Sequence, residues 1–487
     1  MSWKDLAVAH ITRFNWFVLF YFLVLNTTYL FLFIVSLREV LVFVHRTFFS
    51  DYRQIMQSDL TWPISVLVPA FNEEKTIVET VKSLQMVNYG EFEIIVVNDG
   101  STDGTLKRLI DHFELRRVDK VYRRAISTAE VRGIYGSLES PILIVIDKVK
   151  AGKADALNAG INLSKYPLFC SVDADSIIED NALLRVVKPF MEMPEETIAV
   201  GGIVRIANGC RVKDGRVSDV LLPRRPIVIF QVVEYLRAFL TGRVGWSAMQ
   251  SLLSISGAFG LYKRQEVIEV GGYDHDTDTE DLELVVRLHE HMRRKRRKYR
   301  IVFVPDPVCW TEVPSSWKVL RRQRHRWHRG LLQSIWRHKR MFLNPRYGVL
   351  GMIAIPYFVI FEMFGPFIEV LGYTVAILSW ALGILNWTFF LLFLVVAVLY
   401  GIFLSLAAIL LEEISFRRYP AWEDLIKLLV FGVLENLWYR QLLAVFKVKA
   451  FWDFVTRTRK WGEMDRSGFR TASTQSPAGA TRPGTKA

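Results

Sequence analysis

Acidic side chains follow two apolar runs of the chain at the points where the runs end. Asp99 follows EIIVVN, and Asp173 and Asp175 follow LFCSV. In an open α/β sheet, ligands bind beyond the carboxyl ends of the strands. An Asp-x-Asp pair at such a place can offer hard oxygen ligands to Mg²⁺ or Mn²⁺ bridging a diphosphate. We therefore expect Asp173 and Asp175 to hold one of these metal ions.

A Gly-Lys pair in AGKADALNAG (151–160) raises the possibility of a second phosphate-binding segment. The P-loop pattern fails, because Asp147 and Ala154 stand where that motif has Gly and Ser or Thr. Lys153 can still neutralise a phosphate, or it can be a solvated lysine in a loop. The sequence leaves both interpretations open.

The segment TDTEDLELVV (277–286) places three polar side chains directly before an apolar helical stretch. One interpretation is a helix cap, with Asp278 or Thr279 at the capping position. The other is a catalytic pair formed by Glu280 and Asp281, since clustered carboxylates raise one another's pKa and suit a general base. Neither interpretation is excluded by the sequence.

The segment QRHRW (323–327) predicts a helix face with an amide, a guanidinium and an indole. Gln323, Arg326 and Trp327 are spaced i, i+3 and i+4 and so share one face. An arginine can bind phosphate through two hydrogen bonds, and an indole can stack on a sugar ring. The alternative is a basic helix at a membrane interface. We expect three neighbours to point elsewhere, toward lipid headgroups: Arg324, His325 and His328.

The elements that must position these residues alternate between strands and helices. Six apolar runs predict strands: 64–71, 93–99, 141–147, 168–175, 199–206 and 301–306. Helical patterns at 73–87 and 105–118 separate some of them. This alternation predicts an α/β domain on a mostly parallel sheet. We predict that residues 207–250 form an interface or a loop.

Two apolar blocks predict an integral membrane protein. Residues 14–37 carry no charge, and residues 347–411 carry only Glu362 and Glu369. At about 20 residues a span, the second block has room for roughly three helices, and 428–446 is a weaker further candidate. The first block is too long for a signal peptide. One span before the central region and four after it would place the N-terminus outside the cytoplasm. If the stretch 347–364 lies in the membrane interface instead, the number of spans is lower by one.

Charge and cysteine content restrict the class of protein further. The formal net charge is +13, and basic runs at 291–300 and 319–330 lie next to the second apolar block. Such runs mark the cytoplasmic side and attract anionic lipids, so we expect a plasma (inner) membrane protein that binds lipids rather than nucleic acid. Three scattered cysteines suggest neither disulfides nor a zinc site. The predicted parts are 1–49 (helix and linker), 50–345 (cytoplasmic domain), 346–455 (membrane and interface helices) and 456–487 (a basic, disordered cytoplasmic tail).

Taken in order, seven segments resemble the family-2 glycosyltransferases, in particular the membrane-embedded processive polysaccharide synthases. The segments are VPAFNEEKTI, VVNDGSTDGT, GKADALNAG, SVDADS, SGAFG, TEDLEL and QRHRW. The resemblance covers residues 62 to about 345 and implies a GT-A-type (Rossmann-like) α/β glycosyltransferase domain between transmembrane helices. It also implies an inverting, metal-dependent hexosyltransferase.

The same resemblance implies a role for each matching residue. Asp99 and Asp155 would support the nucleotide of a UDP-sugar. The metal would bind Asp173 and Asp175, with Asp175 the more direct ligand, and Asp281 beside Glu280 would deprotonate the acceptor. The donor and acceptor residues complete the set: Lys153, Asp173, Gln323 and Arg326 toward the donor, and Ser256, Gly257 and Trp327 toward the acceptor.

The resemblance also implies a product, a β-linked exopolysaccharide that grows and crosses the membrane. ISGAFG (255–260) lacks the cysteine of cellulose and hyaluronan synthases, which favours UDP-N-acetylglucosamine as donor, with UDP-glucose the other choice. Polar and aromatic residues of the apolar blocks are expected along a glycan path: Glu362, Glu369, Glu435, Asn436 and Arg440, with Trp380, Trp387, Trp438 and Tyr439 stacking on sugars or forming an interfacial belt. Alternatives are a transferase adding one sugar to a lipid carrier and a non-catalytic glycan-binding subunit. Accessory export or regulatory proteins are possible partners.

Overall fold

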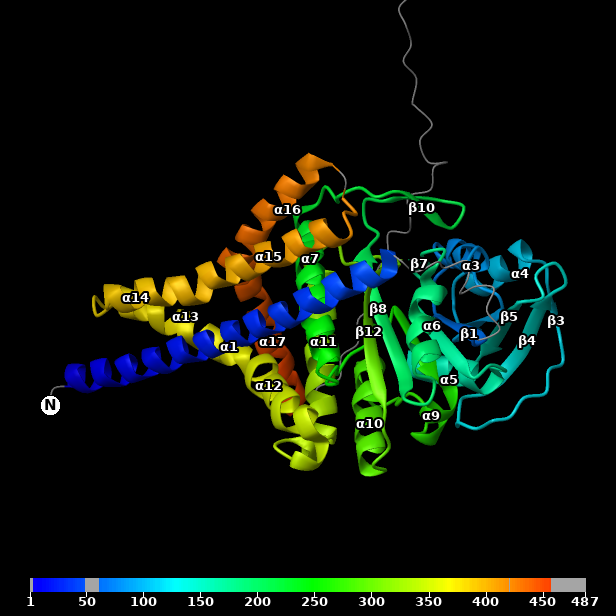
Figure 1. The fold of residues 1–487 in the computed structure, drawn as a ribbon, viewed down its shortest axis with the longest axis horizontal. Coiled ribbons are helices and arrows are strands. Elements are labelled where there is room, and N and C mark those ends of the chain that lie inside the picture. Colours follow the sequence, from blue (N-terminus) through cyan, green and yellow to red (C-terminus); the bar gives the residue numbers. More distant parts are fainter. Residues whose placement is uncertain (1–2, 49–60, 420, 457–487) are drawn as a thin grey trace, which may run out of the picture.

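The computed structural model describes residues 3–48, 61–419 and 421–456. The chain forms a twisted sheet covered by short helices and a bundle of long helices beside it (Figure 1). The predicted tail, apart from residue 456, and the first residues of the predicted central domain (50–60) lie outside the described residues, whereas the predicted linker up to residue 48 continues the N-terminal helix.

Ten strands form one mixed sheet in the order β3-β4-β5-β2-β1-β6-β11-β8-β12-β7. Their bounds are β1 Ile64–Ala70, β2 Phe92–Asn98, β3 Leu115–Arg117, β4 Val131–Ser137, β5 Leu143–Lys148, β6 Leu168–Val172, β7 Ser176–Ile178, β8 Thr197–Ile206, β11 Phe259–Lys263 and β12 Arg300–Thr311. A separate hairpin pairs β9 (Arg211–Lys213) with β10 (Arg216–Asp219). All six predicted strands are present.

The centre of the sheet is parallel, whereas its outer strands are not. β1 pairs in parallel with β2 and β6, and β2 pairs in parallel with β5. The pairings of β11 with β6 and β8, of β12 with β7, and of β4 with β3 and β5 are antiparallel. The expected parallel arrangement therefore holds for β5-β2-β1-β6 and for β8 with β12. The carboxyl ends of the four central strands share one edge of the sheet.

Short helices cover the sheet. Their bounds are α3 Ile77–Gln85, α4 Thr105–His112, α5 Lys153–Leu163, α6 Ala182–Glu192, α9 Arg264–Glu269 and α10 Glu280–Arg294. α3 and α4 occupy the two stretches predicted as helices. The second stretch ends early, because residues after Glu114, which has a positive φ of 48°, continue as strand β3.

Residues 226–248, which the sequence analysis read as interface or loop, are helical. They comprise α7 (Pro226–Tyr235), a π-helical segment (Leu236–Arg243) and α8 (Val244–Ala248). Ser36 of the N-terminal helix donates a hydrogen bond to the carbonyl of Thr241 at 2.6 Å. A methyl group on Gly245 would lie 3.0 Å from the carbonyl oxygen of Leu32, so these two helices meet at backbone distance. This segment joins the sheet to the long helices.

The remaining helices form the bundle. Their bounds are α1 Trp3–Phe48, α11 Trp317–Arg337, α12 Ile355–Tyr357, α13 Gly365–Ala381, α14 Trp387–Leu394, α15 Tyr400–Ser415, α16 Trp422–Leu434 and α17 Arg440–Val455. α13, α14 and α15 run alongside α1, whereas α7, α11 and α17 cross that direction (Figure 1).

Within the described residues, three helices are long and apolar enough to cross a membrane: Val8–Arg46, Trp387–Ser415 and Trp422–Val455. A fourth candidate joins Leu350–Met363 to Gly365–Ala381 across a bend of 40°. The expectation of five spans is therefore too high. The apolar length of 347–381 is shared between two helices that together form at most one bent span.

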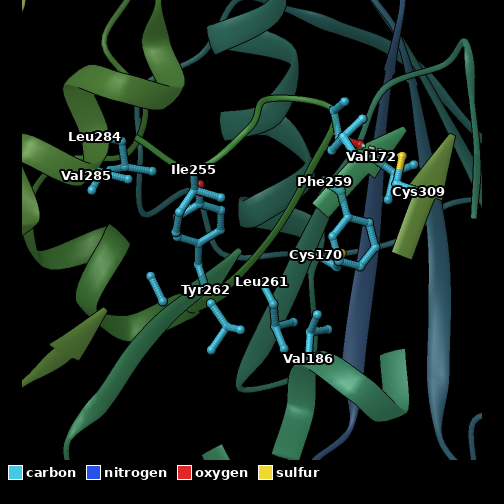
Figure 2. Packing of buried hydrophobic residues seen from close by; sticks show 14 of the residues in the cluster. Cys170, Val172, Val186, Ile255, Phe259, Leu261, Tyr262, Leu284, Val285 and Cys309 are labelled. Carbon is cyan, nitrogen blue, oxygen red and sulfur yellow. Dashed lines mark hydrogen bonds between the residues drawn. The ribbon is translucent and has the colours of Figure 1, made fainter. Parts of the chain in front are cut away.

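The hydrophobic core lies between the sheet and its helices. Figure 2 shows Cys170 of β6 and Cys309 of β12 packed among aliphatic and aromatic side chains, including Phe259 and Leu261 of β11. The three cysteines, Cys210 among them, are buried and free. The expectation that they form no disulfide is confirmed.

Candidate active site

Two of the predicted nucleotide-binding carboxylates are held by a lysine that the sequence analysis did not single out. The Nζ atom of Lys148, at the end of β5, lies 2.5 Å from Asp99 and 2.7 Å from Asp155. Asp99 also accepts hydrogen bonds from the backbone N–H groups of Ala151 at 2.9 Å and Gly152 at 2.7 Å. These contacts shape the turn that leads into α5.

Lys148 is fully buried, with 0% of its side chain exposed. A buried ammonium requires charged or hydrogen-bonding partners, and here both partners come from other segments of the chain. One signal was available in the sequence: Lys148 directly follows a buried strand that ends at the same sheet edge as β2. Its partners could not be identified without the register of β2 against β5, which pairs Asn98 with Asp147.

A cavity of about 770 Å³ opens in front of this turn and continues into the helix bundle. Ten of the predicted site residues line it: Lys153, Asp173, Asp175, Ser256, Gly257, Glu280, Asp281, Gln323, Arg326 and Trp327. Asp99 and Asp155 support the cavity wall from behind, through Lys148 and the turn at residues 151 and 152. Residues from six separate stretches of sequence therefore meet in one place.

Lys153 occupies the centre of the polar end of the cavity. Its Nζ atom lies 2.5 Å from Asp173 and 3.4 Å from Glu280, and it donates a hydrogen bond to the carbonyl of Gly257 at 3.3 Å. Burial alone would lower the pKa of Lys153, but Asp173 and Glu280 raise it above the ordinary lysine value. Lys153 is thus a fixed cation inside the cavity, and its interpretation as a solvated loop lysine is wrong.

Asp173 and Asp175 lie on the turn between β6 and β7. Asp175 is buried and accepts a hydrogen bond from the hydroxyl of Thr311 at 3.4 Å. Across the described ranges, no group of three or more His, Cys, Asp and Glu side chains could hold a metal ion by itself. Two carboxylates fit a divalent ion that takes its other oxygen ligands from a bound diphosphate and water, as Mg²⁺ commonly does.

Asp281 lies in the first turn of α10, facing the cavity. Burial and the neighbouring Glu280 raise its pKa above the ordinary aspartate value, while Lys153 acts in the opposite direction. A methyl group on Gly257 would lie 3.1 Å from an Asp281 carboxylate oxygen and 3.1 Å from Lys153 Nζ. Glycine at 257 therefore keeps the space between the carboxylate and the ammonium open.

The capping interpretation is correct in the position of Thr279 but not in the expected hydrogen bond. Thr279 is the N-cap residue of α10, but its side chain makes no capping hydrogen bond. Asp278 instead forms an ion pair with Arg329 of α11. The carboxylates at 280 and 281 are left facing the cavity.

The predicted face of α11 forms the opposite wall. Gln323 is buried, and both Gln323 and Arg326 line the cavity. Trp327 is 36% exposed and lies at the same wall. The amide, guanidinium and indole therefore converge as their spacing predicted.

Three basic neighbours on α11 do not face lipid headgroups, so that expectation is wrong. Arg324 is buried, pairs with Glu234 at 2.7 Å and stacks on the ring of Trp327 at 4.3 Å. His325 lies 2.8 Å from Asp453 of α17. His328 lines the cavity, and burial lowers its pKa to about 3, which keeps it neutral. Arg324 and His328 are buried and His325 is partly buried, because α17 packs along α11.

The cavity extends into the bundle along charged side chains. Glu362, Glu369, Arg440 and Lys447 line this part together with Tyr29 of α1. Lys447 lies 3.5 Å from Glu362, which also accepts a hydrogen bond from the Tyr29 hydroxyl at 3.3 Å. Charges of both signs therefore continue from Glu280 and Asp281 into the helix bundle.

Other polar and aromatic residues expected along this path lie elsewhere. Glu435 is fully buried, accepts a hydrogen bond from Ser405 at 2.6 Å and lies 3.4 Å from Arg237, and Asn436 donates to the same serine. Trp380 and Trp387 are 65% and 62% exposed on the outside of the bundle. Their positions fit an outer aromatic belt. Trp438 and Tyr439 pack instead against Phe230 of α7.

Comparison with known protein families gives two overlapping matches. The model described as "Glycosyl transferase family 2" matches residues 65–239, and "Glycosyl transferase family group 2" matches residues 169–412, half of the chain. Together they span residues 65–412, which contain nearly all of the sheet and all ten of the predicted site residues that line the cavity.

Among curated proteins, the chain is similar to poly-beta-1,6-N-acetyl-D-glucosamine synthases. It is 30% identical to the one from Staphylococcus epidermidis over 278 residues, which are 56% of this chain and 56% of that protein. It is 30% identical to the one from Staphylococcus aureus (strain COL) over 268 residues, 55% of this chain and 54% of that protein. The chain thus spans about half the length of the curated relatives it matches.

Among solved structures, the chain resembles a mannosyltransferase from Pyrobaculum calidifontis in complex with GDP-Man and Mn²⁺. The TM-score is 0.48 at 19% identity, over 85% of this chain and 99% of that chain. A glucosyl-3-phosphoglycerate synthase from Mycobacterium tuberculosis, with Mn²⁺, UDP and phosphoglyceric acid, gives a TM-score of 0.34 at 17% identity, over 58% of this chain and 82% of that chain. Both TM-scores are below 0.5, so neither likeness supports a conclusion. The observed sheet and the family matches confirm the predicted GT-A-type α/β fold and the predicted resemblance.

Proposed function

Because the chain belongs to family 2 of the glycosyltransferases, we propose that it polymerises a UDP-sugar into a β-linked exopolysaccharide and passes the product through its membrane helices. The support for this proposal is the single continuous cavity. It joins Asp173 and Asp281 at the sheet edge to Glu362, Arg440 and Lys447 on the helix bundle. A transferase that releases a soluble product has no need for such a connection.

The proposed reaction is a single displacement at the anomeric carbon. The Asp281 carboxylate takes the proton of an acceptor hydroxyl, and that oxygen attacks the anomeric carbon of the donor. The bond from this carbon to the diphosphate oxygen breaks, and the electron pair leaves with UDP. One displacement inverts the carbon, so an α-linked donor gives a β-linked product.

The leaving diphosphate gains negative charge during this step. Arg326 on α11 and Lys153 on α5 both project into the cavity and would stabilise that charge. A Mg²⁺ or Mn²⁺ ion held by Asp173 and Asp175 would supply further charge stabilisation to the diphosphate. The turn fixed by Lys148 would seat the nucleotide behind these cations.

The proposed donor is UDP-N-acetylglucosamine. The support is the similarity to synthases named for poly-beta-1,6-N-acetyl-D-glucosamine and the absence of a cysteine in ISGAFG (255–260). UDP-glucose is the second choice. The catalytic domain would lie on the cytoplasmic side, where UDP-sugars are available, with exposed arginines of the segment 293–297 facing lipid headgroups.

The test is turnover and product length with purified protein in nanodiscs. UDP-N-acetylglucosamine, UDP-glucose, UDP-glucuronate and UDP-galactose are offered separately and in pairs with Mn²⁺ or Mg²⁺. A long product ladder from one donor supports a polymerising synthase. Single additions that require an added lipid carrier would support a lipid transferase, and binding without turnover of any donor would support a glycan-binding subunit.

Two aspartate variants on one loop make a matched pair for this test. Asp281→Asn removes the proposed base. Asp276→Asn makes the same chemical change on an exposed side chain five residues earlier. The proposal requires the ladder to disappear in the first variant and to persist in the second.

A further inference from the structure

The face of α11 that lines the cavity continues toward its C-terminus onto the segment before the proposed base. Gln323 and Arg326 face the cavity, and the next turns of the same face carry Arg329, Gly330 and Gln333, at spacings of three and four residues. These three residues contact 278–279 rather than the cavity. One helix therefore connects the donor side of the site to the loop that carries Asp281.

Arg329 and Asp278 form a buried ion pair. The guanidinium of Arg329 contacts both carboxylate oxygens of Asp278, through Nε and, at 2.9 Å, through Nη2. Their side chains are only 8% and 5% exposed. A two-point contact between a planar guanidinium and a carboxylate fixes direction as well as distance. The backbone N–H of Asp278 also donates to Gln333 Oε1 at 2.8 Å.

At the next residue of α11, the side chain of Thr279 packs directly against the backbone of Gly330. A methyl group on Gly330 would lie 2.1 Å from Thr279 Oγ1 and 2.7 Å from Thr279 Cβ. Only hydrogen atoms on the α-carbon of residue 330 fit against Thr279. The position of the N-cap residue of α10 is thus set by direct contact with α11.

The C-terminal end of α11 is joined to α10 as well. His338, the C-cap residue of α11, lies 2.5 Å from Glu290 and 3.2 Å from Glu283 of α10. α10 therefore contacts α11 both directly before its first turn and along its first three turns. A shift of α10 against α11 would have to break both sets of contacts.

We propose that Arg329 is a positioning residue for glycosyl transfer: its ion pair with Asp278 holds Asp281 at a fixed distance from the donor-binding face of α11. The inference rests on the proposed function, because it assigns Arg329 a role through the proposed base. Arg329 does not line the cavity and so acts through Asp278 rather than on substrate. Two charges that neutralise each other can fix geometry while leaving the field at Asp281 almost unchanged.

The tests are the variants Arg329→Lys, Arg329→Met and Asp278→Asn, assayed for kcat, donor KM and UDP affinity. Since a displacement of about 1 Å can cost about 10²-fold in rate, we expect Arg329→Met to lower kcat by about 10²-fold. Arg329→Lys keeps the charge without the two-point contact and should lower kcat by about tenfold. UDP affinity and donor KM should stay within about threefold, because Gln323 and Arg326 remain in place. The acid limb of the pH profile should not move in Arg329→Lys, which keeps the neutralising charge beside Asp278.

Arg337→Met is the matched control. Arg337 is on the same helix and pairs with Asp274 of the same loop, but its side chain is 41% exposed. Its kcat should stay within about twofold of wild type, as expected for an exposed ion pair. Hydrogen exchange gives a readout independent of turnover: amides of 277–284 should exchange faster in Arg329→Met and not in Arg337→Met.

Should Arg329→Met fold poorly, Gly330→Ala perturbs the same contact from the neighbouring residue. It is expected to lower kcat with unchanged UDP affinity. The inference is overturned when folded variants keep wild-type kcat, or when kcat and UDP affinity fall together. If the wild-type protein turns over no donor, the proposed function is overturned instead. The positioning contact is then tested by hydrogen exchange alone, which should be faster for the amides of 277–284 in Arg329→Met than in wild type.

Discussion

Replacement of Lys148 by methionine should destabilise the protein more than any exposed lysine replacement. Methionine fills a similar volume but leaves Asp99 and Asp155 buried near each other without their shared cation. At the observed distances of 2.5 and 2.7 Å, each ion pair is worth about 6 kcal/mol before desolvation at an effective dielectric constant of 20. Desolvation offsets much of this energy, and breaking a buried pair typically costs about 3–5 kcal/mol.

The assay is thermal unfolding of the purified chain in detergent, followed by intrinsic tryptophan fluorescence. For a domain of this size, a loss of about 3–5 kcal/mol lowers Tm by about 10 °C. The affinity for UDP should fall by about tenfold or more, which is about 1.4 kcal/mol, because Asp99 also holds the turn at residues 151 and 152. Lys107→Met, at an exposed position of α4, is the control and should change neither quantity.

A second substitution distinguishes two contributions to the loss of stability: the lost attraction between Lys148 and the aspartates, and the unpaired carboxylates that remain buried. When Asp155→Asn is added to Lys148→Met, one unpaired carboxylate is removed, and part of the lost Tm should return. The reasoning is refuted by a folded Lys148→Met protein with Tm within about 2 °C of wild type and unchanged affinity for UDP. It is also refuted by a double variant less stable than Lys148→Met alone.

Three further predictions concern the cavity. Gly257→Ala inserts a methyl group 3.1 Å from both Asp281 and Lys153. The resulting shift of these side chains by a few tenths of an ångström should lower kcat by about tenfold, with little change in Tm. Burial and Glu280 raise the pKa of Asp281, and the base acts only when it is deprotonated. As the pH is lowered, kcat should therefore begin to fall at pH values that are still above the ordinary pKa range of aspartate. Glu280→Gln should move this limb to lower pH; a limb that stays in place contradicts the assignment. Trp327→Ala should raise the KM for an added oligosaccharide acceptor by up to about tenfold through lost stacking, measured by primer titration; an unchanged KM contradicts an acceptor role.

The sheet and most of the site residues could be predicted because the relevant signals are local. Near-continuous apolar runs indicate strands covered on both faces, and parallel strands bring their carboxyl ends to one edge. Asp99 and Asp173, which follow the parallel strands β2 and β6, therefore lie at the same edge although 74 positions separate their numbers. Spacing within one helix was sufficient for Gln323, Arg326 and Trp327.

The remaining features depend on contacts between distant segments. Lys148 binds Asp99 across two neighbouring strands, and Asp278 pairs with Arg329 rather than capping its own helix. Residues 226–248 show no one-sided apolar pattern, because the helices they form are covered by the sheet on one side and by α16 or α1 on the other. The number of spans was overestimated because apolar length does not reveal the bend at residue 364.

The most direct test of the account is UDP release by the full chain in nanodiscs, compared between wild type and Asp281→Asn at saturating UDP-N-acetylglucosamine and Mn²⁺. UDP binding is measured on the same samples. The account predicts a loss of about 10²–10⁴-fold in kcat, the usual range for a general base, with UDP affinity unchanged. Turnover by Asp281→Asn within a few-fold of wild type would contradict the assignment of the cavity as the site of glycosyl transfer through this base.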